Sequence, residues 1–140
     1  MTKGVGGSTA AEKLSTLKSL RDRAIPIAVE EYQQRLQKVR ELMRESGIDL
    51  LYLDATTSLR YFTGMQCYMS ERLHGALISA SGELIYVCPT FEEQKTRAQM
   101  RVEGDFALWQ EHEDPTRLVA NQALACCTNG SVTLAIDPQT

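Results

Sequence analysis

The sequence predicts an α/β domain with a mixed five- or six-stranded sheet flanked by helices. Apolar runs bounded by turn residues indicate buried strands, and longer segments whose apolar residues recur every three or four positions indicate amphipathic helices. These segments follow one another in the order α, α, β, loop, β, β, α, β, α, β. Helices and strands that each bury one face pack naturally in layers, so this order favours helices on the faces of a mixed sheet.

Two helices are expected before the first strand. Residues 9–24 carry a stripe of leucines, Ser8 or Thr9 can cap the segment, and Pro26 interrupts it. The leucines of the stripe are Leu14, Leu17 and Leu20. Residues 28–46 carry a longer apolar stripe at the same spacing, and the glycine after it supplies the positive φ that ends such a helix.

Three strands follow, and two of them are expected to form a hairpin. Residues 48–55 are short, apolar and bounded by turn signals, which indicates a central strand. Residues 73–80 and 83–89 are separated by Ser81-Gly82, a tight-turn dipeptide. The two runs are therefore expected to pair antiparallel.

The remaining segments alternate between helix and strand. The elements expected are a helix over residues 91–101 capped by Thr90, a strand over 105–111, a helix that starts at Pro115 and stops at Asn129-Gly130, and a strand over 131–137. Proline at the first turn of a helix and Asn-Gly after its last turn are typical positions for these residues.

The composition excludes several classes of protein. The chain has 15 Lys and Arg against 18 Asp and Glu, a net charge of −3, and no basic cluster, so no nucleic-acid partner is expected. No apolar run approaches the roughly 20 residues that span a bilayer, and the first residues lack the apolar core of a signal peptide, so no membrane partner is expected. The four cysteines form no C-x-x-C pair and fit a reducing compartment, so we expect a cytoplasmic protein.

The sequence offers no catalytic residue and no metal ligand set in this chain. Its two histidines, His74 and His112, are too few for a credible metal site, and no nucleophile stands beside a paired base. The glycine-rich residues 4–8 lack the preceding strand and the following Lys-Ser/Thr of a phosphate loop. The adjacent Cys126 and Cys127 are expected to be structural.

The connection TSLRYFTGMQCYMSERLHGALIS, residues 57–79, is richer in aromatic and charged residues than a simple turn requires. We expect LRYFTG to be an anchored turn set by Thr63 and Gly64, with Tyr61 and Phe62 in the core. We expect CYMSER to project from the surface. The connection therefore combines an anchored part with a part that can reach a ligand or another chain.

Residues 32–92 resemble the N-terminal domain of the creatinase, prolidase and aminopeptidase P family, the "pita-bread" metallopeptidases. YQQRLQKVRELMRESGIDLLYL looks like the opening helix and first strand of that family. SLRYFTG is similar to its Arg-Tyr-Leu-Thr-Gly type of turn, and ERLHGALISASGELIYVCPTFE to the hairpin that follows. The likeness covers residues 28–137 and implies the same mixed sheet, with a ribonuclease H-like motif.

The resemblance implies a domain of a larger enzyme. Residues 28–137 would be the N-terminal domain, residues 1–27 a flexible start with an extra helix, and residues 138–140 the start of a linker to a C-terminal catalytic domain. The parent is expected to be a Xaa-Pro dipeptidase or aminopeptidase, a hydrolase whose catalytic domain holds two divalent metal ions, manganese or cobalt. The 140-residue chain alone is expected to be inactive.

By the same resemblance, the domain acts as a lid on a substrate pocket and as a dimerisation element. The parent is expected to be a homodimer that acts on short proline-containing peptides. The candidate substrate-binding or interface residues are Arg72, Tyr68, Tyr61 and His74, because arginine can hold a carboxylate bidentately and aromatic rings can line a proline-sized pocket. Two structural alternatives stay open: an exposed ion pair of Arg72 with Glu71, and a hydrogen-bonded core histidine at His74.

Two other functions stay open. A creatinase-like amidinohydrolase shares the fold, and relatives that lack the metal ligands serve as binding modules. The sequence of the expected catalytic domain distinguishes the three. Two Asp, one His and two Glu ligands would indicate a peptidase. A metal-free pocket with a general-base His would indicate a creatinase. The absence of both would indicate a binding module.

Overall fold

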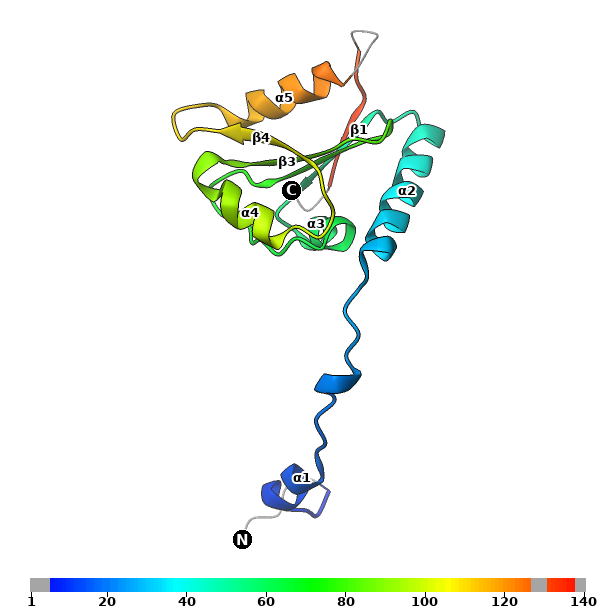
Figure 1. Cartoon of the computed structure of the whole chain (residues 1–140), viewed down its shortest axis with the longest axis vertical. Helices are drawn as coiled ribbons and strands as arrows, with labels where there is room; N and C mark the ends of the chain where they lie inside the picture. Colours follow the sequence, from blue (N-terminus) through cyan, green and yellow to red (C-terminus); the bar gives the residue numbers. More distant parts are fainter. Residues whose placement is uncertain (1–5, 127–130, 138–140) are drawn as a thin grey trace.

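The chain folds around a five-stranded sheet with helices on both faces (Figure 1). The computed structural model describes residues 6–126 and 131–137. The strands lie in the order β4-β3-β2-β1-β5. Their bounds are β1 Leu50–Asp54, β2 Gly75–Ser79, β3 Leu84–Pro89, β4 Asp105–Trp109 and β5 Leu134–Ile136. The mixed sheet flanked by helices that the sequence predicts is confirmed.

The sheet combines antiparallel and parallel pairs. β1 pairs with β2 and β2 with β3 in antiparallel fashion, which confirms the predicted hairpin. β3 pairs with β4 and β1 with β5 in parallel fashion. β1 has a neighbour on each side, as expected for an apolar strand. β5 is shorter than the strand predicted over residues 131–137, and the predicted Asn129-Gly130 stop lies outside the described residues.

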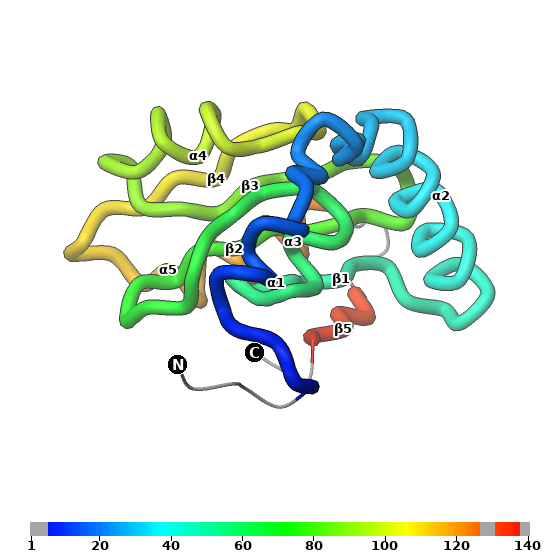
Figure 2. Tube along the Cα trace, turned by 90° about the horizontal axis from the view of Figure 1, so that it is seen from below, coloured from blue at the N-terminus to red at the C-terminus, as the bar shows by residue number. Residues whose placement is uncertain are grey.

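The helices divide between the two faces of the sheet. Their bounds are α2 Val29–Glu45, α3 Thr57–Thr63, α4 Glu93–Gln99 and α5 Pro115–Ala125. Leu36 of α2 and Leu59 of α3 belong to one buried cluster, whereas Val119 and Ala123 of α5 belong to a second one. Figure 1 shows α5 on one side of the sheet and the other three helices opposite, and in Figure 2 α3 lies between α4 and α2.

Two arginines hold α2 against the hairpin. Arg40 donates from Nη2 to the carbonyl of Gly82 at 2.7 Å and from Nε to that of Ser79 at 3.2 Å. Arg44 donates from Nη1 to the carbonyl of Ala80 at 2.6 Å. A cationic donor makes a stronger hydrogen bond than a neutral one, so α2 and the β2–β3 turn form one structural unit.

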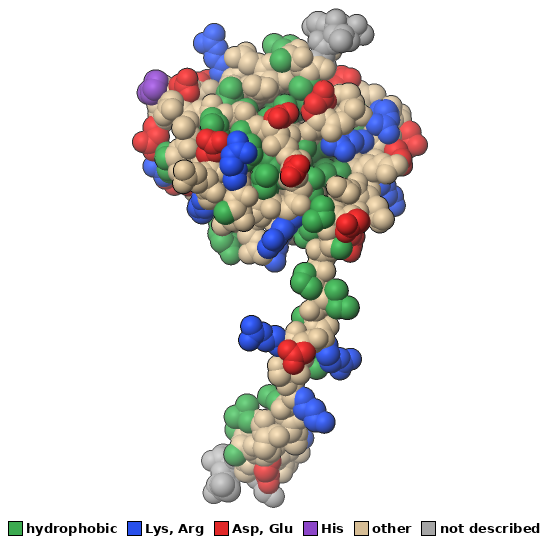
Figure 3. Space-filling view, in the orientation of Figure 1, with side chains coloured by type: hydrophobic (Ala, Val, Ile, Leu, Met, Phe, Trp, Pro, Cys, Tyr) green, Lys and Arg blue, Asp and Glu red, His purple; other side chains and the backbone are tan. Residues whose placement is uncertain are grey.

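The amino-terminal segment differs from the single helix predicted over residues 9–24. It forms α1 (Ala10–Thr16) and the short 3₁₀ turn η1 (Arg21–Arg23), which stand away from the sheet (Figures 1 and 3). Thr9 caps α1 as the sequence predicts, in a capping box with Glu12. The three leucines of the predicted stripe are 63 to 72% exposed. A short helix without tertiary packing is marginal in water, which explains why α1 ends early.

The motif LRYFTG forms the end of a helix, not the anchored turn that the sequence predicts. α3 spans Thr57–Thr63, and Gly64 follows it in the left-handed conformation at φ +72°. Leu59 is fully buried and Phe62 packs against the same core, but Tyr61 is 51% exposed, so the prediction of a buried Tyr61 is wrong. Residues three apart share one face of a helix, and Tyr61 lies outside the face that Leu59 and Phe62 share.

The helix predicted over residues 91–101 is shorter and starts differently. A 3₁₀ turn, η2 (Thr90–Glu92), precedes α4, and Thr90 does not cap it. The Thr90 hydroxyl donates instead to the carbonyl of Trp109 at 3.2 Å, which ties η2 to the end of β4. α5 begins at Pro115 as predicted, and the carboxylate of Asp114 caps it.

Gly64 is required where α3 ends. An ideal Cβ at this position would lie 2.5 Å from Cγ of Arg101 and 2.9 Å from Cζ of Tyr32. We expect Gly64→Ala to lower the free energy of unfolding by about 2–5 kcal/mol, because left-handed strain costs about 1–2 kcal/mol and overpacking about 1–3 kcal/mol. Urea denaturation monitored by circular dichroism measures the change.

Gly47→Ala is the matched control. Gly47 has nearly the same backbone conformation, at φ +67°, but no atom lies within 4 Å of an added Cβ. We expect this variant to lose only the strain component, about 1–2 kcal/mol. Equal losses in the two variants would contradict a steric requirement at Gly64.

Candidate functional site

The segment from Gly64 to His74 joins α3 to β2 and carries three of the four candidate residues. Met65 is buried in the core and Cys67 is half-buried, so the segment is anchored at its beginning. Tyr68 is 88% exposed, and the segment therefore projects as the sequence predicts.

Arg72 is held by two carboxylates and one aromatic ring. Its Nε and Nη2 donate to Oε1 of Glu111 at 3.1 and 2.9 Å, and its Nη1 donates to Oε1 of Glu71 at 2.5 Å. The guanidinium carbon lies 5.5 Å from the centroid of Phe91. The hydrogen bond with Glu111 raises the pKa of Arg72 further, so the side chain stays charged. The predicted Glu71 pair is present, and Glu111 adds a second one that the sequence did not indicate.

His74 is buried between the start of β2 and α4. Its Nε2 lies 3.1 Å from Oγ1 of Thr96, and its Nδ1 lies 3.4 Å from Oε2 of Glu92. Burial lowers the pKa of His74, although Glu92 opposes the shift. The hydroxyl of Thr96 also donates to the carbonyl of Glu92 at 3.0 Å, so each ring nitrogen of His74 faces a polar group of the η2–α4 segment. This is the hydrogen-bonded core histidine that the sequence left open as the structural alternative.

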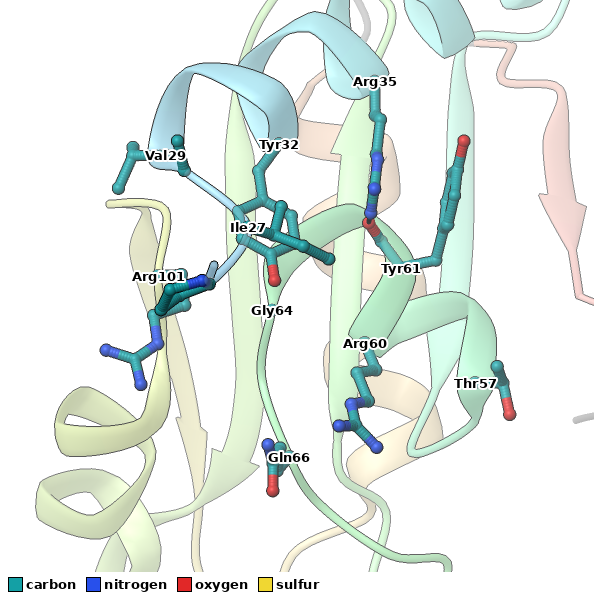
Figure 4. Close-up of a pocket in the computed structure, with 12 residues that line it drawn as sticks. Ile27, Val29, Tyr32, Arg35, Thr57, Arg60, Tyr61, Gly64, Gln66 and Arg101 are labelled. Atoms are coloured by element: carbon teal, nitrogen blue, oxygen red, sulfur yellow. Dashed lines mark hydrogen bonds between the residues drawn. The ribbon is translucent and has the colours of Figure 1, made fainter. Parts of the chain in front are cut away.

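Three candidates line one hollow, and the fourth lies elsewhere. Tyr68, Arg72 and His74 border a hollow of about 240 Å³ together with Glu92 and residues of α4. Tyr61 is on α3 beside α2, where the guanidinium carbon of Arg35 lies 4.2 Å from its ring centroid. It borders a different groove (Figure 4).

The sequence did not identify the residues that orient the candidates. Glu92 and Thr96 sit on the η2–α4 segment, and Glu111 and Phe91 reach Arg72 from segments that follow β4 and β3. Their signal is weak in the sequence because each looks like an ordinary residue near a helix start. The pairing of β2 with β3 and of β3 with β4 brings Glu111 to Arg72.

The described residues offer little reactive chemistry around the hollow. Burial raises the pKa of the Cys67 thiol to about 11, so the thiolate is scarce at neutral pH. Across residues 6–126 and 131–137, no three His, Cys, Asp or Glu side chains gather in a group that could hold a metal ion. In the same part of the chain, no helix combines the length and the apolar character needed to cross a membrane.

The chain belongs to the Creatinase/Prolidase N-terminal domain family, whose model matches residues 35–140. It is 26% identical over 87 residues to a Xaa-Pro dipeptidase of Lactobacillus delbrueckii subsp. lactis, a match that covers 62% of this chain and 23% of the relative. The chain thus spans about a quarter of the length of that relative. The resemblance seen in the sequence is confirmed.

Solved structures share the fold at lower identity. Dipeptidase PepE from Mycobacterium ulcerans superposes with a TM-score of 0.71 at 22% identity, over 83% of this chain and 31% of that one. The N-terminal domain of a Xaa-Pro dipeptidase from Lactobacillus brevis superposes with a TM-score of 0.66 at 17% identity, over 76% and 78% of the two chains. The second neighbour is an N-terminal domain by itself, and the likeness extends over most of both chains.

The buried position of His74 predicts a pH dependence of stability. The pKa of His74 is lower in the folded chain than the ordinary histidine pKa of about 6.5 that applies to the unfolded chain. Below about pH 6.5 the unfolded chain therefore binds a proton at this residue more readily than the folded chain does. The contribution of neutral His74 to the free energy of unfolding is therefore complete above about pH 6.5 and is lost as the pH falls. We expect His74→Gln to flatten the fall in the free energy of unfolding between about pH 7.5 and about pH 5.5, measured by urea denaturation at each pH.

His112→Gln is the control, because His112 is exposed. This variant is expected to keep the pH dependence of the unsubstituted chain. If the two variants behave alike, the pH dependence does not arise from His74.

Proposed function

We propose that the chain is the non-catalytic N-terminal domain of a metal-dependent Xaa-Pro dipeptidase or aminopeptidase, where it contributes to dimerisation and covers a substrate pocket. The observation that carries the proposal is the projecting segment of a domain from this family, with Tyr68 almost fully exposed and Arg72 fixed behind it. Tyr68 and its neighbour Met69 are both exposed on this segment, and a partner or substrate would cover them together.

The geometry suits recognition of a short peptide. Three of the five N–H groups of Arg72 are engaged by Glu71 and Glu111, which leaves two to donate to a substrate carboxylate. The same bonds hold the guanidinium in one place, so little side-chain entropy is lost on binding. The ring of Tyr68 can cover a proline side chain, and His74 fixes the point where the segment joins β2.

Tyr61 suits a different role in the proposal. Its ring is exposed on α3, apart from the hollow, and Arg35 stacks on one face of it. A contact with a second chain would cover it, in line with the expected homodimer. Aromatic residues and arginine are enriched in the buried centres of protein interfaces.

Two divalent ions, manganese or cobalt, would supply an activated water in a separate catalytic domain. The described residues of this chain offer no set of ligands for these ions. In the proposal its residues bind and orient the substrate and cover the pocket. A creatinase-like amidinohydrolase would use the same domain in the same way, and a proline-peptide assay of the parent distinguishes it from a peptidase. A binding module would give no turnover of either substrate.

The chain alone is expected to cleave no Xaa-Pro dipeptide, with or without added Mn²⁺, because none of its described residues forms a metal site or an activated nucleophile. Chromatographic detection of free proline from Ala-Pro measures the reaction. Turnover that a chelator abolishes would show that the chain carries its own catalytic centre and would overturn the proposal.

In the complete parent protein, Tyr68→Ala and Arg72→Ala are each expected to lower kcat/KM for a Xaa-Pro peptide at least about tenfold, which is about 1.4 kcal/mol of transition-state stabilisation. Arg72→Lys should recover little, because lysine keeps the charge but lacks the planar fork. Steady-state kinetics and thermal unfolding on the same samples separate loss of activity from loss of folding.

Met69→Ala is the matched control, because Met69 is exposed on the same segment but borders no part of the hollow. It is expected to keep kcat/KM within about twofold. Unchanged kinetics in the Tyr68 and Arg72 variants would remove this segment from the substrate pocket.

A further inference from the structure

A second and larger concavity lies between the start of α2, α3 and Arg101 (Figure 4). Its volume is about 870 Å³, which is in the range of sites that hold a peptide-sized ligand. The residues that line it include three arginines, Arg35, Arg60 and Arg101, and no aspartate or glutamate. We refer to it as the arginine groove. It shares Gln66 with the hollow around His74 but none of the candidate residues Tyr68, Arg72 and His74.

The three arginines differ in how they are used. Arg35 is occupied: it pairs with Glu31 and donates from Nη1 to the carbonyl of Tyr61 at 2.8 Å. The guanidinium groups of Arg60 and Arg101 make no hydrogen bond or ion pair with any described residue, and both side chains are exposed. The groove therefore presents two cations without carboxylate partners in the described part of the chain, and such cations attract anionic groups.

Tyr32 adds a hydrogen-bonding group to the groove. The residue is 8% exposed and lines the groove, and its hydroxyl makes no hydrogen bond with a described residue. Its ring packs over Gly64, where an added Cβ would lie 2.9 Å from Cζ. Figure 4 shows its hydroxyl directed toward Gly64, with the polar ends of Arg60 and Gln66 beyond. Among the described residues only the hydroxyl of Tyr52 is both buried and without a partner, so the Tyr32 hydroxyl reaches the open space of the groove and is free to donate to a ligand.

The start of α2 adds to this polarity. Ala28 precedes the first turn and cannot cap it, so no side chain satisfies the N–H groups that open onto the groove. The first turn of this 17-residue helix carries Glu30 and Glu31, which already balance part of its dipole, so its contribution to the groove is the uncapped N–H groups. Four features thus favour the same kind of group: Arg60, Arg101, the Tyr32 hydroxyl and the start of α2.

The apolar residues of the groove define the rest of the ligand. Ile27, Val29 and Tyr61 border it and are all exposed. A free inorganic anion would leave these side chains uncovered, whereas apolar side chains beside a carboxylate would bury them. Guanidinium groups match the geometry of a carboxylate well.

We propose that the arginine groove binds a short acidic peptide segment, with a carboxylate that accepts from Arg60 and the Tyr32 hydroxyl and with apolar neighbours that lie on Ile27, Val29 and Tyr61. Arg101 supplies a second cation at the edge. The site differs from the proposed substrate pocket, since Tyr68 and Arg72 take no part in it. It gives the domain a binding function that stands whether or not the parent is a peptidase.

The test compares two peptides that differ in one group. Acetyl-Leu-Glu-Leu-amide and acetyl-Leu-Gln-Leu-amide have the same shape, but only the first carries a carboxylate. Titration of the ¹⁵N-labelled 140-residue chain followed by NMR is expected to give binding of the Glu peptide at least about tenfold tighter than of the Gln peptide, weakened by added salt. The amides of Val29, Gly64 and Gln66 should show the largest shifts.

Three variants locate the site. Arg60→Gln and Tyr32→Phe are each expected to weaken the Glu peptide about tenfold or more, and Tyr32→Phe keeps the ring that packs on Gly64. Arg117→Gln on α5 removes an exposed arginine from the opposite face of the sheet and is expected to leave the affinity unchanged. Equal binding of the Glu and Gln peptides, or an equal effect of Arg117→Gln, would overturn the proposal.

Inorganic phosphate and acetyl-Ala-Glu-Ala-amide separate a peptide site from a simple anion site. We expect phosphate to compete weakly and the alanine peptide to bind more weakly than the leucine peptide, because each lacks the larger apolar side chains. Tight phosphate binding together with equal affinity for the two acidic peptides would mean that only the anion is recognised. That result would overturn the peptide assignment.

Discussion

Gly64 is the residue on which both surfaces of the domain depend. Its left-handed backbone ends α3 and directs the chain into the segment that carries Tyr68 and Arg72. Its missing Cβ also lets Tyr32 and the stem of Arg101 lie directly on the backbone, which forms the floor of the arginine groove. A side chain at this one position would displace both neighbours, so the start of the projecting segment and the depth of the groove are set together.

The two surfaces differ in the balance of their charges. In the hollow, Arg72 is paired with Glu71 and Glu111. The two carboxylates balance its charge and hold its guanidinium in one orientation. In the groove, Arg60 and Arg101 have no carboxylate partner among the described residues. Paired charges discriminate through hydrogen-bond geometry, whereas unpaired cations attract anions over a distance of about one Debye length. The hollow therefore presents a guanidinium in a fixed orientation, whereas the groove presents a positive charge that carboxylates do not balance.

Local patterns predicted the sheet well and the surfaces poorly. The strands, the hairpin and the start of α5 at Pro115 depend on residues close in sequence, so periodicity and turn chemistry identified them. The length of the amino-terminal helix depends on whether a partner surface exists, which spacing does not encode. The exposure of Tyr61 follows from the helix that forms where a turn was predicted. The Arg72–Glu111 pair spans 39 positions and needs the β3–β4 pairing, so the sequence indicated Arg72 as a candidate but not its partner.

Burial shifts the pKa values of three titratable groups near the projecting segment away from the range that acid–base chemistry uses. His74, the histidine nearest to the projecting segment, is buried, hydrogen-bonded and biased toward its neutral form. The Cys67 thiol resists ionisation, and the buried Tyr52 hydroxyl has its pKa raised by burial as well. A general base or nucleophile needs a pKa near the working pH and access to substrate, and none of these three groups combines both. The groups of the projecting segment that reach solvent, Tyr68 and Arg72, offer a ring and a fixed guanidinium, which suit recognition and not proton transfer.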